Sequence, residues 1–408
     1  MRRKSSATGV RAASAMGDIR KKICLASPEF PPEQWGGLAR SVRNVARHAR
    51  ALGMDVHVAH FTVARDVLVL LDENRETQEV DGITVHRIAL GREKLPGAAR
   101  ELWDCPHTLT LQMMYQSLEK LHSDVGFDLF HSFFLYPVGF VVGMLARRVG
   151  VPSIATIVGN DVKRYIFSPE KVAVCRSGLE NADVVVGLSK DLIEMAHALT
   201  PVEHKARIIY NSVRLPESAW SARQVSAPFK IGCAGIFKYA KGLPYLLKAV
   251  SVVTKRHGVV VELVGTVRES EREAYEIMLE RSGTAAVVRL REPLPHHGVT
   301  EWLRTLDLFV LPSVTEGCPN ILMEAMAIGA PCVATRTGAV EFLIEDGVSG
   351  ILARWGDSRS LADAIMKMIT DRQMAESMGR RARERMTAFS PEVEKNAWEQ
   401  VYRDLLQT

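Results

Sequence analysis

One stretch, Asp307–Ile328, decides the fold: it reads DLFVLPSVTEGCPNILMEAMAI. Its first five residues form a short apolar run typical of a buried strand, and the residues after the loop are apolar on nearly every side, which predicts a buried helix. Glu316 lies in the loop and Glu324 on the second turn of the helix. A carboxylate on a buried helix is costly unless it has a partner, and the hydroxyls of a ligand would supply one. The alternative for Glu324 is a solvated helix residue.

Short apolar runs and longer amphipathic segments alternate along the rest of the chain. A first series of predicted strands runs from Ile23–Ala26 to Arg207–Tyr210, and a second from Lys230–Gly235 to Gly350–Ala353. Amphipathic segments such as Leu38–Leu52 separate most of them. This alternation predicts βαβ units, and therefore an α/β fold of mostly parallel sheets covered on both faces by helices.

A polar stretch rich in Pro, Ser and Ala, residues 216–228, interrupts the alternation and divides the chain into two doubly wound, Rossmann-like domains. We expect an N-terminal domain over residues 22–215, a C-terminal domain over residues 216–390 and a last helical segment over residues 391–408. Two such sheets place a ligand cleft between the carboxyl ends of their strands. Residues 1–21 are basic and rich in Ser and Ala, which predicts a disordered lead-in.

Composition excludes several classes of protein. The 408 residues are 47% hydrophobic and 24% charged, which is not the composition of a disordered chain, a collagen-like fibre or a polytopic membrane protein. A net charge of +5, without a basic stripe interleaved with aromatics, argues against nucleic acid as a partner. The six cysteines never form a C-x-x-C pair, which argues against a zinc ribbon and a disulfide scaffold and predicts a reducing, cytoplasmic location.

One uncharged stretch, Leu129–Ala146, approaches the length of a membrane-spanning helix. His131, Ser132 and Pro137 interrupt it. A buried strand over Leu129–Phe133, a turn and a buried helix explain the stretch better, so we expect no transmembrane span.

Two glycine-bounded loops are further candidates for a site. Gly36-Gly37 precedes a helix, and free amides with the helix dipole favour an anion at such a point. Gly235–Gly242 carries Lys238 and Lys241, which together could hold a diphosphate as point charges. Taken alone, the first could be an ordinary turn and the second a solvated loop.

The stretch with Glu316 and Glu324, seven residues apart, resembles the E-x7-E signature of the retaining glycosyltransferases of family four, which have the GT-B fold. Other tracts resemble the family's motifs in the right order: Gly36-Gly37, Thr156–Asp161 (T-x-H-G-x-D), Tyr210–Val213 (P-N-G-V), Gly235–Gly242 and the final helix, which looks like the one that crosses back onto the N-terminal domain. The resemblance covers nearly the whole chain from Lys22 onward.

The resemblance implies a role for each matching residue. Glu316 would bind hydroxyls of a donor sugar and Glu324 those of a ribose, while Lys238 and Lys241 would neutralise the donor's diphosphate. The remaining predicted donor contacts come from loop residues around these groups: Gly36, Gly37, Gly317, Cys318, Pro319 and Asn320. Stabilising the leaving diphosphate and an oxocarbenium-like centre in this way needs no metal and no cofactor beyond the nucleotide sugar.

Three tracts depart from the family's pattern. Val158 stands where the T-x-H-G-x-D segment usually has histidine, and the candidates to compensate are Asp161, His131 and His60. We include Asp161 among the predicted catalytic residues, although a structural role is the alternative for all three. Ile236 replaces a frequent arginine of the clamp, and the tract Thr337-Gly338-Ala339-Val340-Glu341 is shorter than the family's and lacks its proline, so the choice of acceptor could be unusual.

The first predicted helix carries a separate hypothesis. Arg40, Arg43, Arg47 and Arg50 fall near one face, and no acidic residue occurs between Leu38 and Met54. A basic amphipathic helix can dock on anionic lipid, which would place the protein at the inner face of a membrane. A solvated face is the alternative.

The sequence therefore predicts a hexosyltransferase of GT-B fold. It would move a hexose or N-acetylhexosamine from a nucleoside diphosphate sugar, with UDP favoured by the resemblance alone, to an unknown acceptor hydroxyl in carbohydrate or natural-product biosynthesis. The rivals are a sugar-nucleotide epimerase or phosphorylase on the same fold and a non-catalytic partner subunit.

Overall fold

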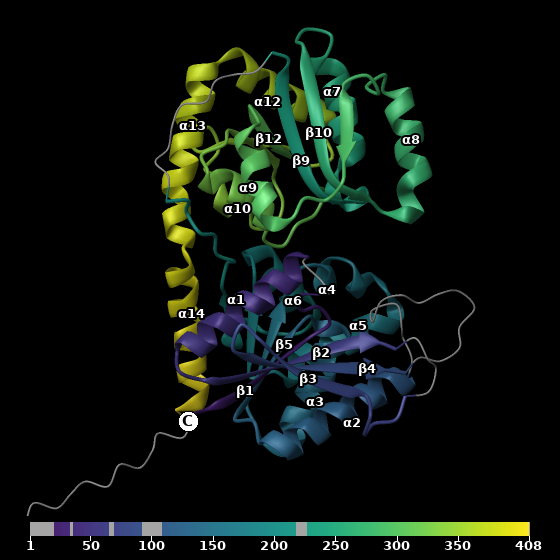
Figure 1. The fold of residues 1–408 in the computed structure, drawn as a ribbon, viewed down its shortest axis with the longest axis vertical. Coiled ribbons are helices and arrows are strands. Elements are labelled where there is room, and N and C mark those ends of the chain that lie inside the picture. The colour runs from purple at the N-terminus through teal and green to yellow at the C-terminus, as the bar shows by residue number, and fades with distance from the viewer. Residues whose placement is uncertain (1–19, 33–35, 65–68, 92–107, 218–226, 408) are drawn as a thin grey trace, which may run out of the picture.

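The computed structural model describes residues 20–32, 36–64, 69–91, 108–217 and 227–407 (Figure 1). Most of the predicted lead-in, most of the predicted linker and residues 33–35 of the first glycine loop lie outside these ranges.

Two separate sheets form the framework, and their strand series fall on either side of the linker. The N-terminal sheet has eight strands in the order β3-β4-β2-β1-β5-β6-β7-β8. Its strands are β1 (Lys22–Ser27), β2 (Asp55–Val63), β3 (Arg75–Val80), β4 (Ile83–Leu90), β5 (Leu129–Phe133), β6 (Ser153–Ile157), β7 (Val184–Gly187) and β8 (Ala206–Ile208). All neighbours pair in parallel except β3 and β4. The sequence reading missed β3 because its residues, RETQEV, are polar and mostly exposed on the edge of the sheet.

The second sheet has six parallel strands in the order β11-β10-β9-β12-β13-β14. Its strands are β9 (Phe229–Phe237), β10 (Val259–Val267), β11 (Val288–Arg291), β12 (Leu308–Leu311), β13 (Cys332–Thr335) and β14 (Ile351–Ala353). Below, the N-terminal domain means the first sheet with its helices, and the C-terminal domain the second. Two mostly parallel sheets in one chain confirm the predicted fold class.

Helices cover both sheets. Those of the N-terminal domain are α1 (Gly37–Ala51), α2 (Thr108–Val125), α3 (Phe140–Val149), α4 (Asn160–Lys163), α5 (Pro169–Asn181) and α6 (Lys190–Leu199). Those of the C-terminal domain are α7 (Leu243–Val253), α8 (Arg272–Arg281), α9 (His296–Arg304), α10 (Asn320–Ala327), α11 (Val340–Leu343), α12 (Ser358–Thr370) and α13 (Arg372–Arg385). No helix in the described part of the chain is long and apolar enough to cross a membrane. The uncharged stretch 129–146 is strand β5, a turn and most of α3, as predicted.

The last helix, α14 (Pro391–Leu406), returns to the N-terminal domain and packs beside α1 (Figure 1). Trp398, Val401 and Tyr402 are buried in the same apolar cluster as Val42 and Val45 of α1. The Tyr402 hydroxyl lies 3.0 Å from Nδ1 of His131 in β5, and Glu394 lies 3.2 Å from Nε2 of His48. A single helix therefore ties the end of the chain to the first sheet.

The docking of α14 predicts a large stability effect at Trp398, which is only 1% exposed. Trp398→Ala should lower the free energy of unfolding by about 3–5 kcal/mol, because it leaves a cavity between α14 and the first sheet. Urea unfolding followed by circular dichroism measures this. Val393→Ala, at a half-exposed position of the same helix, should change it by less than about 0.5 kcal/mol. Equal effects of the two substitutions would contradict the docking.

Candidate active site

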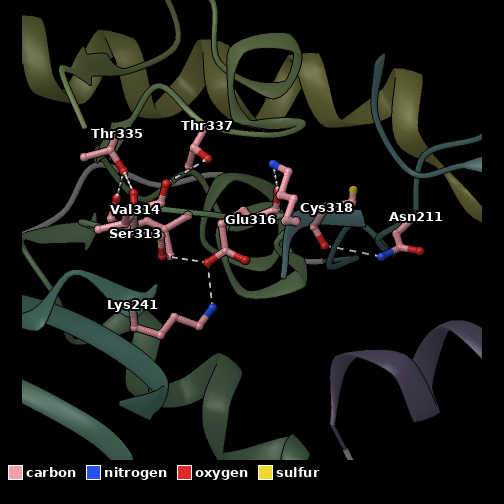
Figure 2. A network of polar contacts seen from close by, with 10 residues as sticks. Asn211, Lys241, Ser313, Val314, Glu316, Cys318, Thr335 and Thr337 are labelled. Carbon is pink, nitrogen blue, oxygen red and sulfur yellow. Dashed lines mark hydrogen bonds and ion pairs between the residues drawn. The ribbon is translucent and has the colours of Figure 1, made fainter. Parts of the chain in front are cut away.

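The two loops that the sequence singled out in the C-terminal domain meet at the carboxyl ends of neighbouring strands. Strand β9 pairs with β12, so the loop after β9, with Lys241, lies beside the loop after β12, with Glu316. Lys241 Nζ lies 2.6 Å from Glu316 Oε1, and Ser313 Oγ donates to the same oxygen at 2.6 Å (Figure 2). The side chains of Lys241 and Glu316 are 21% and 11% exposed. The predicted clamp lysine and the first glutamate thus form one partly buried ion pair.

Close backbone packing fixes these loops. Gly242, at φ +68°, lies so close to the Pro312 carbonyl that a Cβ would stand 1.8 Å from its oxygen. Gly338 packs in the same way against the Glu316 carbonyl, where a Cβ would stand 2.2 Å from the oxygen. Thr335 and Thr337 donate their hydroxyls to the carbonyls of Ser313 and Val314 (Figure 2). Any side chain at either glycine would displace the Glu316 loop.

The N-terminal domain contacts the same loop from the opposite side. A Cβ on Gly317 would stand 2.3 Å from the carbonyl oxygen of Val158, so these two segments touch through their backbones. Lys163 Nζ donates to the Glu316 carbonyl at 2.6 Å. An apolar cluster also continues from one domain to the other, with Leu192 of α6 and Leu322 of α10 among its members. The Glu316 loop therefore lies where the two domains meet.

The second glutamate, Glu324, is 9% exposed and pairs with Arg40 of α1 in the N-terminal domain. The partner that its burial requires is thus present within the chain. Arg40 does not belong to a free basic face. Arg43 and Arg47 pair with Asp81 in the turn between β3 and β4, and Arg50 donates to the Asp81 carbonyl. Residues distant in sequence thus neutralise three of these arginines and bind the fourth, and the membrane contact proposed for this face stays a prediction.

The starts of α1 and α10 come together through Asn211. Its amide nitrogen donates to the Cys318 carbonyl at 3.4 Å (Figure 2). The same nitrogen donates to Asn320 Oδ1 at 3.0 Å, and the amide oxygen accepts from Ser41 Oγ at 2.9 Å. Asn320 in turn donates to the Gly37 carbonyl at 3.5 Å. The predicted donor-binding residues Gly36, Gly37, Gly317, Cys318, Pro319 and Asn320 are therefore gathered at one place.

Positive charge collects beside the Lys241–Glu316 pair. The pKa of Lys238 is lowered, first by burial and then by repulsion from Lys241, Arg268 and Arg164, while Glu316 acts in the opposite direction. Arg268 follows β10 and Arg164 follows α4, so both domains contribute. Within the described ranges, neither these two arginines nor Lys238 makes an ion pair with an acidic residue. Such a group of cations suits a polyanionic ligand.

Family models match both domains: "Glycosyl transferase 4-like domain" over residues 36–212 and "Glycosyl transferases group 1" over residues 228–371. The chain belongs to glycosyltransferase family four. It is 29% identical to a D-inositol 3-phosphate glycosyltransferase of Corynebacterium jeikeium, over 69% of this chain and 73% of that protein. It is 27% identical to an N-acetyl-alpha-D-glucosaminyl L-malate synthase of Bacillus anthracis, over 69% and 75% of the two chains.

Solved structures of the GT-B fold match over nearly the whole chain. A sucrose-phosphate synthase from Thermosynechococcus elongatus superimposes with a TM-score of 0.77 at 22% identity, covering 95% of this chain and 100% of that one. The HepE protein of Anabaena, solved in complex with UDP-glucose, gives a TM-score of 0.71 at 17% identity, covering 94% and 100%. At these identities the likeness shows the fold alone, and it confirms the predicted GT-B architecture.

The three residues proposed to compensate for Val158 in this family four member all have contacts within the protein. Asp161 is fully buried, and its carboxylate accepts the backbone N–H groups of Val158 and Gly159 at 3.1 and 2.8 Å. Burial raises its pKa to about 6, although the amides act in the opposite direction. His131 is enclosed between Thr156 and Tyr402, and burial lowers its pKa to about 3.

His60 is fully buried and lies 2.7 Å from Arg87. Its pKa is lowered to about 4 by burial, and the charge of Arg87 adds to the effect. These contacts hold the structure of the N-terminal domain, which is the alternative that the sequence left open for all three residues. A catalytic role for Asp161 stays a prediction.

Sequence reasoning missed Lys163, Arg164 and Arg268. Lys163 and Arg164 directly follow the Thr156–Asp161 tract, and Arg268 follows a strand that was predicted. Nothing distinguishes them from other cations in one sequence, because only the folded chain brings Lys163 to the Glu316 loop and the two arginines near Lys238.

The lowered pKa of Lys238 predicts a pH-dependent affinity for nucleoside diphosphate. A bound anion raises the pKa of the Lys238 ammonium. At a pH above the pKa that Lys238 has without ligand, binding must therefore take up a proton, and the affinity falls as the pH rises. Calorimetric titration with UDP should show this loss beginning below pH 10.5, the ordinary value for lysine. Lys238→Arg should shift the loss upward, since a guanidinium keeps its charge to a pH above about 12. Identical pH profiles would contradict this role of Lys238.

Proposed function

We propose that the protein is a retaining hexosyltransferase, which transfers a hexose or N-acetylhexosamine from a UDP-sugar to an acceptor hydroxyl without a divalent metal. The observation that carries the proposal is the Lys241–Glu316 contact at the domain junction, with the cation Lys238 beside it. A carboxylate that accepts hydroxyls and ammonium groups that bind a diphosphate are the two functions that a nucleotide-sugar donor requires in one place.

In this proposal, the charges act mainly on the leaving group. As the glycosidic bond breaks, negative charge grows on the diphosphate, and Lys238 and Lys241 stabilise it more in the transition state than in the ground state. Glu316 orients the sugar through its hydroxyls. Glu324 binds the ribose, and Arg40 holds its carboxylate when no donor is bound. Closure of the domains over the reacting centre excludes water.

Relatives support the choice of donor and of reaction. Two are named for transfer to inositol 3-phosphate and to malate, and HepE of Anabaena was solved with UDP and with UDP-glucose. Metal independence is supported by the positive charge already present, because Lys238, Arg164 and Arg268 together can neutralise a diphosphate. A peripheral membrane contact through α1 stays a prediction, weakened by the ion pairs to Asp81 and Glu324.

Glu316→Gln tests the proposal. It should lower kcat for sugar transfer by about a hundredfold or more, because an amide neither pairs with Lys241 nor accepts the sugar hydroxyls as strongly. The assay follows release of UDP and the glycosylated product by mass spectrometry, with EDTA present, over a panel of UDP-sugars and acceptors. Glu280→Gln, at an exposed position on α8, is the matched control and should leave kcat unchanged.

The anomeric configuration of the product tests the retaining mechanism by NMR. An α-linked donor should give an α-linked product. A β-linked product from the same α-linked donor would contradict retention. Full activity of Glu316→Gln would contradict the assignment of the site. Conversion of the donor to another nucleotide sugar without an acceptor would instead identify the rival epimerase.

A further inference from the structure

Lys163, the last residue of α4, connects the two domains at the Glu316 loop. Its side chain is only 11% exposed. Its Nζ donates to the Glu316 carbonyl at 2.6 Å and lies 2.5 Å from Asp191 Oδ2 on α6. The ammonium therefore lies between a carboxylate of its own domain and the backbone of the opposite one.

Asp191 neutralises Lys163, which distinguishes it from Lys238, Arg164 and Arg268. Ser189 Oγ donates to the second carboxylate oxygen, Oδ1, at 2.5 Å, so the position of Asp191 is fixed as well. Because the charge of Lys163 is already balanced, its contact with the Glu316 carbonyl serves orientation and adds little to the field on a diphosphate. Lys238 is the opposite case, with no acidic partner in the described ranges.

The Glu316 residue is held by both domains. Lys241 and Ser313 of the C-terminal domain fix its side chain, and Gly338 packs against its carbonyl. Lys163 from the N-terminal domain is the only hydrogen-bond donor to this carbonyl that the described contacts contain. When the domains separate, Glu316 keeps its side-chain partners but loses the contact that orients its backbone.

We propose that Lys163 is a positioning residue, which sets the orientation of Glu316 toward the donor sugar and does so only while the two domains are together. This rests on the proposed function, since it assigns Glu316 to the sugar. The sugar of the donor is then held for transfer only when the N-terminal domain is in place, and an enzyme with its domains apart binds the nucleotide without engaging its sugar.

Comparing two ligands in Lys163→Met tests the proposal. UDP lacks the sugar and does not use Glu316, so its Kd should stay within about twofold of the wild-type value. The Kd of the UDP-sugar that the wild-type enzyme uses should rise, and kcat should fall by about ten- to a hundredfold, the range for a hydrogen bond to a charged group. Calorimetric titration and initial rates measure these. Lys163→Arg should recover part of kcat.

Two further variants separate positioning from loss of structure. Lys163→Met leaves Asp191 without its cation, so Lys163→Met/Asp191→Asn removes both charges and should fold while showing the same loss of kcat. Lys190→Met, on α6 beside Asp191, removes a lysine whose only ion pair within the described ranges is the exposed one to Glu194, and should leave kcat and both Kd values unchanged. Thermal unfolding of each variant verifies the fold.

The outcomes distinguish this inference from the function on which it rests. An active wild-type enzyme with unchanged kcat in folded Lys163→Met overturns the positioning role alone. Weakening of UDP and UDP-sugar by the same factor also overturns it, because Lys163 would then act on the diphosphate. A folded wild-type protein that transfers no sugar overturns the proposed function instead.

Discussion

The ion pair between Lys241 and Glu316 is the interaction on which the rest of the site depends. It exists because β9 and β12 are neighbours in a parallel sheet, so the loops that follow them leave from the same edge. Gly242 and Gly338 make room for these loops by packing without a side chain against their carbonyls. The contact between the Lys241 ammonium and the Glu316 carboxylate thus follows from the order of the strands and from the close packing at two glycines.

The N-terminal domain completes this arrangement with groups that are themselves buried or paired. Asp161 accepts the amides of Val158 and Gly159 and so shapes the turn whose carbonyl packs against Gly317. Arg40 meets Glu324 and Lys163 meets the Glu316 backbone. Glu316 and Glu324 are therefore both contacted from the N-terminal domain, and the distance between the domains determines how the two glutamates are held.

How much the sequence predicts depends on the range of the interaction. The strand, loop and helix of residues 307–328 and the last helix follow from apolar patterns, because neighbouring residues decide them. Strand β3 was missed because its polar residues lie on an edge and carry no such pattern. Arg40, Arg43, Arg47 and Arg50 were placed on one helix face, but their partners, Glu324 and Asp81, are brought there only by the tertiary fold. The contact between Lys163 and the Glu316 carbonyl could not be predicted either, because only the tertiary fold brings these two residues together.

Titration of the purified protein with UDP, GDP and ADP in the presence of EDTA tests most directly whether the domain junction is a nucleotide site. The account predicts that one of the three binds without metal, and that Lys241→Ala weakens it by about tenfold or more, since a charge on the diphosphate loses its cation. If none of the three bound to the folded protein, or if Lys241→Ala bound as tightly as the wild type, the junction would not be the donor site.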